Sequence, residues 1–143
     1  MSRPTKSVVR EMLDREAIRD LPVRYCHYVW TNDVDSMMGL FIEDGLLSTA
    51  SDADDEVREI AGAEALRAFY VGLDAIKPRP YIHNHVVDLL GDGQAKGTCY
   101  VELRLATKGM EPLGTGYYDD EYVKIEGAWK FKARRYKAIR GSR

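Results

Sequence analysis

Three histidines are the side chains of this 143-residue sequence whose type and spacing best suit proton transfer or metal binding. His83 and His85 stand two residues apart in the stretch YIHNH, and His27 lies in RYCHYVW. A neutral imidazole has an ordinary pKa of about 6.5, so it can accept a proton from a substrate near neutral pH. Three histidines would also suit an open zinc site, but a lone His-x-His is a weak metal signal. We therefore expect proton transfer or a structural role, with no metal ion and no other cofactor.

The pairing register of the strand that contains His83 and His85 decides whether they can meet a substrate. The next predicted strand, residues 95–106, has an apolar face with Cys99, Val101, Leu103 and Leu105, and a polar face with Tyr100, Glu102 and Arg104. If His85 pairs with Tyr100, both histidines lie on the polar side of the sheet. A shift of one residue turns both of them toward the apolar side.

Helical patterns dominate the first half of the chain. Apolar residues recur at helical spacing over residues 7–30, where Pro22 is expected to kink the helix or divide it in two. A short helix follows, with Asn32 or Asp33 as its cap, Phe41 on its apolar side and EDG at residues 43–45 as its end. A third, amphipathic helix is predicted over residues 61–76, and its inward side carries Ala65, Leu66, Phe69, Tyr70 and Leu73.

Strand patterns dominate the second half. Four strands are predicted over residues 81–90, 95–106, 114–125 and 129–138, and two short strands precede the third helix. Because the turns between the four strands are short, they should form an antiparallel meander. Helices followed by an antiparallel sheet indicate an α+β fold in a single domain, residues 1–143.

Alternation along GYYDDEYVK places Tyr117 and Asp119 on one strand face and Tyr118 and Asp120 on the other. One of the two tyrosines is expected to line a pocket and the other to pack outside it. The C-terminal stretch KFKARRYKAIRGSR is basic but alternates with apolar residues, and this pattern predicts a solvated strand edge.

Composition excludes several classes of function. The net charge is −2 with both signs interspersed, which argues against a nucleic-acid-binding surface. No apolar run reaches membrane-spanning length and the first residues hold no apolar leader, so we expect a cytoplasmic protein that does not enter membranes. Cys26 and Cys99 have no CxxC or CxxH neighbour and are predicted to be buried free thiols.

Three stretches carry a resemblance to a known superfamily: DREAIRDLPVRYCHYVWTNDVDSMMGLFIEDG, YIHNHVVDLLGDGQAKGTCYVELR and GYYDDEYVKIEGAWKFKARRY. Together they cover nearly the whole chain. They resemble the SnoaL-like branch of the nuclear-transport-factor-2-like superfamily. The resemblance implies a cystatin-like cone, in which N-terminal helices pack on a strongly curved, mainly antiparallel sheet around an internal pocket. This fold hosts many functions, so the resemblance predicts the fold better than the activity.

Dehydratases and dehydrochlorinating lyases of the superfamily use an Asp–His dyad, and both of its positions differ here. The helical Asp position falls on Trp30, and the strand His position falls on Pro80. The nearest carboxylates are Asp33 and Asp35, and Asp33 is a helix-cap candidate and also a candidate acid or base. Asn84 matches an inward-facing Asn of the family, which favours an outward facing for both histidines. Tyr25 matches a tyrosine that lines the pocket of the related dehydratases.

Two hypotheses for function follow. The first is a cofactor-independent, dehydratase-type lyase or isomerase for a small hydrophobic, polycyclic or polyketide-like molecule, with His83, His85 and Asp33 as candidate catalytic residues. The second is a non-catalytic small-molecule-binding or assembly module resembling the small subunits of ring-hydroxylating dioxygenases. The candidate ligand contacts are Tyr25, Trp30, Phe41, Phe69, Tyr70, Tyr81, Asn84, Val101, Leu103, Tyr117 and Trp129. The outer sheet face with Tyr100, Glu102 and Arg104 is the expected homodimer surface.

Overall fold

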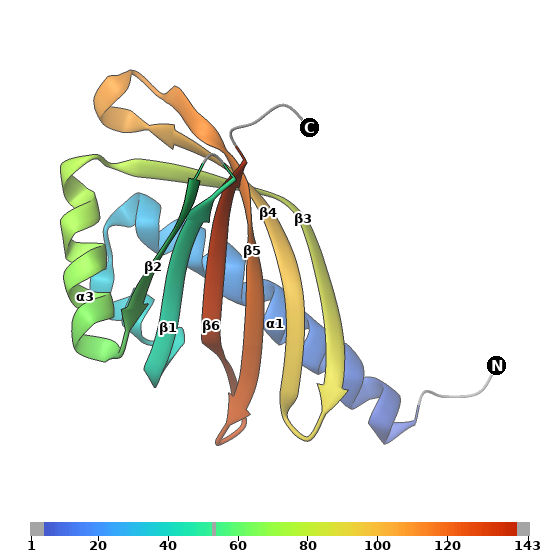
Figure 1. Cartoon of the computed structure of the whole chain (residues 1–143). Coiled ribbons are helices and arrows are strands. Elements are labelled where there is room, and N and C mark those ends of the chain that lie inside the picture. Colours follow the sequence, from blue (N-terminus) through green and yellow to red (C-terminus); the bar gives the residue numbers. More distant parts are fainter. Residues whose placement is uncertain (1–4, 53, 140–143) are drawn as a thin grey trace.

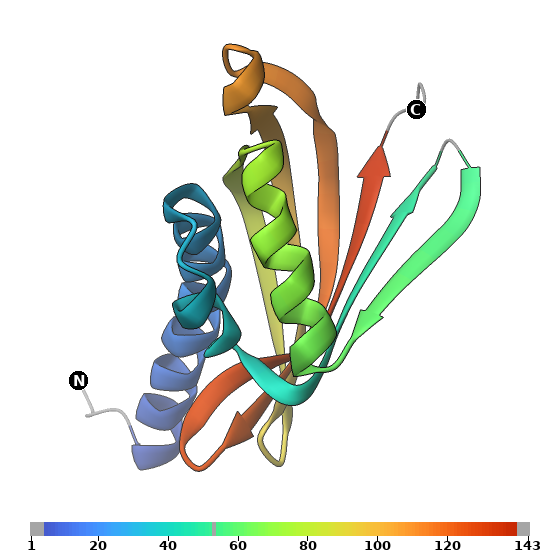
Figure 2. The same ribbon diagram turned by 90° about the vertical axis from the view of Figure 1, so that its left-hand side faces the viewer.

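One long helix, two shorter helices and a six-stranded sheet make up residues 5–52 and 54–139, the part that the computed structural model describes. Helix α1 (Lys6–Thr31) lies along the sheet, and its first turns extend past the sheet edge (Figure 1). Figure 2 shows α1, α2 and α3 on the same side of the sheet. Helices that cover one sheet face agree with the predicted α+β class, and they leave the other face of the sheet open.

Helix α1 runs through Pro22 without division, so a break into two helices, one of the two expected outcomes, is wrong. Proline removes one backbone donor from a helix, which usually weakens it. Here Ile18 before the proline and Tyr25 after it are both buried against the rest of the protein. Tertiary packing on both sides of Pro22 therefore keeps the helix continuous.

Helix α2 (Val34–Met38) is shorter than the sequence pattern indicates. Asp33 caps it as predicted, because its side chain accepts a hydrogen bond from the Ser36 backbone N–H. Gly39 ends the helix, and Phe41 begins strand β1 (Phe41–Ser51), so the expected helical placement of Phe41 and of EDG at 43–45 is wrong. Phe41 still faces the core, since its side chain is only 4% exposed.

The remaining elements follow the predicted order. They are β2 (Asp54–Ala61), α3 (Ala63–Gly72), the short turn of helix η1 (Leu73–Ala75), β3 (Pro78–Gly91), β4 (Gln94–Leu105), the turn η2 (Ala106–Lys108), β5 (Glu111–Ile125) and β6 (Ala128–Ile139). The strand order is β2-β1-β6-β5-β4-β3. Strands β3 to β6 form the predicted antiparallel meander, and β1 joins β6 in parallel, so the sheet is mixed and mostly antiparallel.

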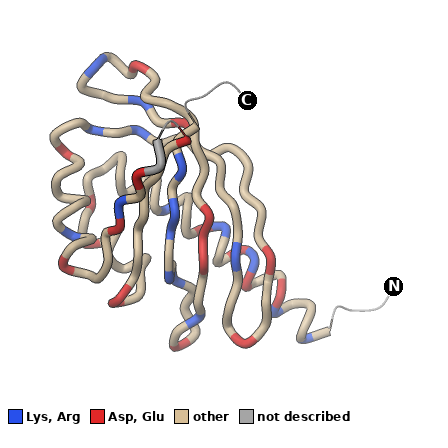
Figure 3. The backbone as a smooth tube through the Cα atoms, viewed as in Figure 1, with Lys and Arg blue, Asp and Glu red and all other residues tan. Residues whose placement is uncertain are grey.

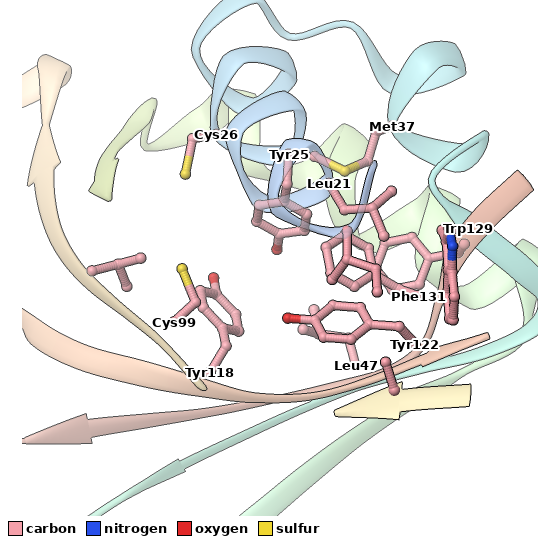
Figure 4. Close-up of a cluster of buried hydrophobic side chains, with 14 of the residues drawn as sticks. Leu21, Tyr25, Cys26, Met37, Leu47, Cys99, Tyr118, Tyr122, Trp129 and Phe131 are labelled. Atoms are coloured by element: carbon pink, nitrogen blue, oxygen red, sulfur yellow. The ribbon is translucent and has the colours of Figure 1, made fainter. Parts of the chain in front are cut away.

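The core lies between α1 and the sheet. Strand β4 contributes Cys99 and Val101, and β5 contributes Tyr118 and Tyr122, all of them buried. Figure 4 shows the rings of Tyr25, Tyr118 and Tyr122 gathered between the helix and the strands. The pairing of Tyr100 with Tyr117 puts these two residues on the opposite, outer face, where their rings lie 5.9 Å apart. The alternation predicted for β4 and β5 is therefore confirmed.

A bulge in β3 separates the two histidines that the sequence placed on one face. Ile82 pairs with Val101 and His85 pairs with Cys99, so three steps along β3 face two along β4. A bulge inserts one unpaired residue and changes which side the following residues face. His85 therefore lies on the inner face, while His83 and Asn84 are exposed. The expected outward facing of His85 and inward facing of Asn84 are both wrong.

Charged residues of both signs are spread over the described chain rather than gathered on one face (Figure 3). Among the helices of residues 5–52 and 54–139, none is both long and apolar enough to cross a membrane.

Candidate functional site

A cavity of about 170 Å³ lies between α1, the α3–η1 segment and the inner face of the sheet. Its apolar lining consists of Val29, Leu47, Phe69, Leu73, Ile76, Pro78, Pro80, Leu103 and Leu113. Its polar lining consists of the hydroxyl-bearing side chains Tyr25, Thr49, Tyr118 and Tyr136. None of these described lining residues is Asp, Glu, His, Lys, Arg or Cys. The cavity therefore has the apolar wall and few polar groups that are typical of small-molecule sites.

The structure brings only some of the predicted ligand contacts to this cavity. Tyr25, Phe69 and Leu103 line it, and their role in binding stays a prediction. Tyr118 is the tyrosine of the Tyr117–Tyr118 pair that faces the cavity. The other predicted contacts lie outside this lining: Trp30, Phe41, Tyr70, Tyr81, Asn84, Val101, Tyr117 and Trp129.

Several of these residues have a clear structural environment instead. Phe41 and Val101 are core residues with almost no exposed surface. The Trp129 indole N–H donates a hydrogen bond to Asp14 of α1 over 2.9 Å, far along the helix from the cavity wall. Tyr70 lies directly behind Tyr25, and their hydroxyl oxygens are 2.9 Å apart.

The cavity tyrosines are proton donors rather than bases. Burial raises the pKa of Tyr25 well above its ordinary value, with a smaller raising contribution from Tyr70. Burial also raises the pKa of Tyr118 well above 10, and Tyr25 adds to this effect. Both side chains therefore keep their protons at neutral pH and can donate a hydrogen bond to an oxygen of a ligand.

Behind these two tyrosines lies a fully buried ion pair between β5 and β6. Arg134 Nε donates to Asp120 Oδ1 over 2.8 Å, and Nη2 donates to Oδ2 over 3.1 Å. The guanidinium carbon lies 3.7 Å from the ring centre of Tyr118 and 4.4 Å from that of Tyr25. Aromatic faces attract cations, so the rings help to compensate the loss of hydration of Arg134. Among the described atoms, Arg134 Nη1 finds no hydrogen-bond partner.

A hydrogen-bond chain continues from this ion pair to His85. The Tyr122 hydroxyl donates to Asp120 Oδ2 over 2.9 Å, and His85 Nε2 lies 2.9 Å from the same hydroxyl. Because the one hydroxyl proton goes to Asp120, the oxygen must accept from His85 Nε2–H. This leaves Nδ1 of the neutral imidazole as the nitrogen with the free lone pair.

The His85 imidazole is neutral at physiological pH. Burial is the largest cause, and the positive charges of Arg134 and Arg19 add to it, so the pKa of His85 falls to about 4. A base with so low a pKa is weak, although it is fully available at neutral pH. His85 also lies outside the described cavity lining, so the cavity and this imidazole are two separate features.

The three candidate catalytic residues do not form one constellation. His83 is exposed on the bulge of β3, and Asp33 is exposed and holds Ser36 with both carboxylate oxygens. Hydrogen bonds from Ser36 are the largest cause that lowers the pKa of Asp33, which is the behaviour of a helix cap. Within the described chain, His27, His83 and His85 do not come together as a group that could hold a metal ion.

Cys26 and Cys99 are free and buried, as predicted. Burial is the main reason that the pKa of Cys26 rises to about 12 and that of Cys99 to about 11. Thiols of such high pKa carry almost no thiolate at neutral pH, so they serve as core residues and not as nucleophiles.

Sequence reasoning missed Asp120, Tyr122 and Arg134 as components of the site. A second bulge, in β6, explains why the sequence pattern misplaced Arg134. Tyr122 pairs with Phe131 and Glu121 with Ala133, so one step along β5 faces two along β6. Asp120 then pairs with Arg134. Strict alternation from Phe131 would turn Arg134 toward solvent, but its side chain is 0% exposed. The predicted solvated edge is wrong, because β6 lies inside the sheet between β1 and β5. The only sequence signal was the alternation of Tyr118, Asp120 and Tyr122 on the inner side of one strand.

A model of the SnoaL-like domain matches residues 10–135. No protein among the curated sequences matches the chain.

Several solved structures have the same fold as this chain. A single-residue variant of Rv3472, a protein of unknown function from Mycobacterium tuberculosis, is 28% identical; the match covers 94% of this chain and 76% of that one with a TM-score of 0.79. A candidate scytalone dehydratase from Novosphingobium aromaticivorans is 20% identical, with 90% and 85% of the two chains covered and a TM-score of 0.73. The beta subunit of a candidate aromatic-ring-hydroxylating dioxygenase from the same organism is 17% identical, with 92% and 94% covered and a TM-score of 0.76. The last two likenesses show a shared fold.

Proposed function

Because the chain belongs to the SnoaL-like domain family, we propose that it forms the family's cone around an internal pocket and binds a small, mainly apolar molecule there. The observation that carries the proposal is the cavity of about 170 Å³, with an apolar wall and tyrosine hydroxyls as its main polar groups. Apolar cavities of this size hold small aromatic molecules, and a few polar groups orient them. The ligand is therefore a compact hydrophobic molecule that carries at least one oxygen.

Binding without catalysis is the class that this lining supports best. Tyr25 and Tyr118 stay protonated at neutral pH, and no stronger base stands among the described lining residues. The hydroxyls can hold and polarise an oxygen atom, but they cannot remove a proton. A small-molecule-binding or assembly module fits this chemistry.

Titration with naphthalene and with 4-nitroanisole tests the proposal. In two-dimensional NMR spectra, the backbone amides of cavity residues such as Leu47 and Leu103 should shift with a saturable dependence on ligand concentration. Leu103→Trp should fill the cavity and abolish these shifts. Tyr100→Trp, on the outer face of the same strand, is the matched control and should bind normally. The absence of saturable shifts in the wild-type protein with both ligands would refute the proposal.

A lyase or isomerase activity is the second candidate, and the hydrogen-bond chain at His85 is the observation that favours it. Tyr122 and Asp120 fix the imidazole so that Nδ1 keeps its lone pair, as a general base requires. Exchange of the α-protons of 1-tetralone for deuterium, followed by NMR, measures the activity. His85→Gln should abolish the exchange, and His83→Gln, on the exposed bulge, should not affect it. Equal exchange rates in the two variants would reject His85 as the base.

We also propose that two copies associate through the outer sheet face. Tyr100 and Tyr117 form a ring pair on this face, and opposite charges alternate along a row four residues away on β4, in which Asp88 pairs with Lys96 and Lys96 with Glu121. Such a row can match its own copy across a twofold axis. Sedimentation velocity should give a dimer that Tyr117→Lys dissociates; a wild-type monomer at tens of micromolar would contradict the proposal.

A further inference from the structure

The buried Arg134–Asp120 pair is an oriented dipole, and its positive end is the end nearer the cavity. Tyr25 and Tyr118 line the cavity, and the guanidinium carbon lies within 4.4 Å of both ring centres. Asp120 accepts its remaining hydrogen bond from Tyr122, which is not among the cavity-lining residues. The cavity wall therefore stands between the ligand space and a positive charge.

The two charges of the ion pair affect the pKa values of the surrounding tyrosines differently. At Tyr25 and Tyr118 burial dominates and raises the pKa, but Arg134 acts against it at both residues. At Tyr122, on the other side of the pair, burial again raises the pKa most, but here the raising effect of Asp120 exceeds the lowering effect of Arg134. The positive field thus strengthens the cavity tyrosines as hydrogen-bond donors. At Tyr70, next to Tyr25, burial raises the pKa most, and Asp120 also raises it, but less than Arg134 lowers it there.

Solvent screens the field of this ion pair very little. The side chains of Arg134 and Asp120 are both 0% exposed, so their field is not screened by water or salt as a surface pair would be. The guanidinium also keeps one nitrogen, Nη1, without a hydrogen-bond acceptor in the described protein. Preorganised donors and dipoles of this kind stabilise negative charge on an oxygen without a reorganisation cost.

We propose that the cavity selects ligands whose oxygen is anionic, a phenolate or an enolate, over neutral ligands of the same shape. This proposal rests on the proposed binding function, and it specifies the class of ligand that binds in the cavity. The aromatic or alicyclic body of the ligand occupies the apolar wall, and its oxygen meets the hydroxyls of Tyr25 and Tyr118. A carboxylate on a small ring is a weaker fit, because its two strongly hydrated oxygens would both need donors in a mostly apolar space.

The matched ligands 4-nitrophenol and 4-nitroanisole test the selectivity. They share one ring and one nitro group, but only the phenol can ionise, and its phenolate is recognised by its visible absorption. At a pH well below the solution pKa of 4-nitrophenol, the bound molecule should show the phenolate band, with the ionised fraction raised by about tenfold or more. Saturation of the same NMR shifts by 4-nitroanisole should require a higher ligand concentration.

Two variants test whether the ion pair and the Tyr118 hydroxyl cause the ionisation of bound 4-nitrophenol. Asp120→Leu combined with Arg134→Met removes the dipole and leaves an apolar core, and bound 4-nitrophenol should then stay neutral. Tyr118→Phe keeps the ring against Arg134 but deletes its hydroxyl, so it should reduce the ionised fraction even if the double variant does not fold. Tyr117→Phe, on the outer face of the same strand, is the control and should behave as the wild type.

The outcomes separate the two proposals. If both ligands bind but bound 4-nitrophenol stays neutral in the wild-type protein, the anionic selectivity is wrong and the binding function stands. If the phenolate forms equally in wild type, the double variant and Tyr118→Phe, the assigned cause is wrong. If neither ligand binds, the binding function fails and the selectivity fails with it.

Discussion

The indole N–H of Trp30 donates a hydrogen bond to the carbonyl oxygen of Pro80 over 2.9 Å. These are the two positions at which the superfamily resemblance expects an Asp–His dyad. The positions are thus adjacent in space, but a structural hydrogen bond occupies them in place of an acid–base pair. Strand β3 is an edge strand of the sheet, and Trp30 covers one of its backbone carbonyls. Arg15 covers another, since its Nη1 donates to the Val87 carbonyl over 2.9 Å.

Substitution Trp30→Phe should lower the free energy of unfolding by about 1 kcal/mol, because it removes this hydrogen bond and leaves the Pro80 carbonyl without its partner. Urea denaturation followed by the fluorescence of the remaining Trp129 measures the loss. Tyr100→Phe, an aromatic change on the outer face, should stay within about 0.5 kcal/mol of wild type. A Trp30→Phe protein as stable as the wild type would show that the Trp30–Pro80 hydrogen bond does not stabilise edge strand β3.

The ion pair between Asp120 and Arg134 should respond very differently to single and double substitutions. Asp120→Leu or Arg134→Met alone should cost about 3–5 kcal/mol, because the remaining charge stays buried without a partner. The double variant Asp120→Leu and Arg134→Met should recover most of that loss. Thermal and urea denaturation of the wild type, the two single variants and the double variant give the coupling energy. Additive losses would contradict a direct interaction.

Stability should fall as the pH drops from about 6.5 toward 4 because of His85. Burial, reinforced by Arg134 and Arg19, lowers the folded-state pKa of this imidazole from 6.5 to about 4. The unfolded chain therefore binds a proton in this window that the folded protein does not. The contribution is fully present above pH 6.5, and the loss should approach about 2 kcal/mol after allowance for partial solvent access.

Urea denaturation at several pH values measures this effect through variants. His85→Asn should remove the part of the pH dependence that lies in this window. His83→Asn, at an exposed histidine, should leave that part intact. Asp120, whose pKa burial raises, titrates in all three proteins, so the differences between them isolate His85. An unchanged pH dependence in His85→Asn would contradict the assignment.

Gly97→Ala should destabilise the sheet by about 2 kcal/mol or more. A Cβ atom at this position would lie 2.4 Å from the Val86 carbonyl oxygen and 3.0 Å from the Tyr122 hydroxyl oxygen. Neither neighbour can move freely, because one belongs to the paired strand and the other holds Asp120 and His85.

The matched control for this substitution is Gly72→Ala at the end of α3. Gly72 has φ of −66° and no atom within 4 Å of the added Cβ, so the change should be neutral or stabilising by up to about 1 kcal/mol. Urea denaturation should thus separate the two alanine variants by several kcal/mol. Similar stabilities would argue against close packing at Gly97.

Local sequence signals were sufficient for the elements and their order. Helical spacing over residues 7–30, alternation in the last four strands and the short turns between them predicted an α+β protein with an antiparallel meander, as found. The Asp33 cap, the burial of both cysteines and the opposite facing of Tyr117 and Tyr118 were predictable for the same reason. Each depends on residues that are neighbours in the chain or on one strand.

The site itself was decided by tertiary structure. One bulge in β3 turned His85 inward and left His83 outside, and another in β6 turned Arg134 from the expected solvent face into the core. A strand pattern has a period of two, so one extra residue reverses the facing of every residue that follows. The sequence by itself determined the elements, the strand faces within each regular stretch and the family. Only the folded chain determined where that regularity breaks. The breaks in turn determined the Asp120–Arg134 ion pair, the rings of Tyr25 and Tyr118 against it, and the cavity that these rings line.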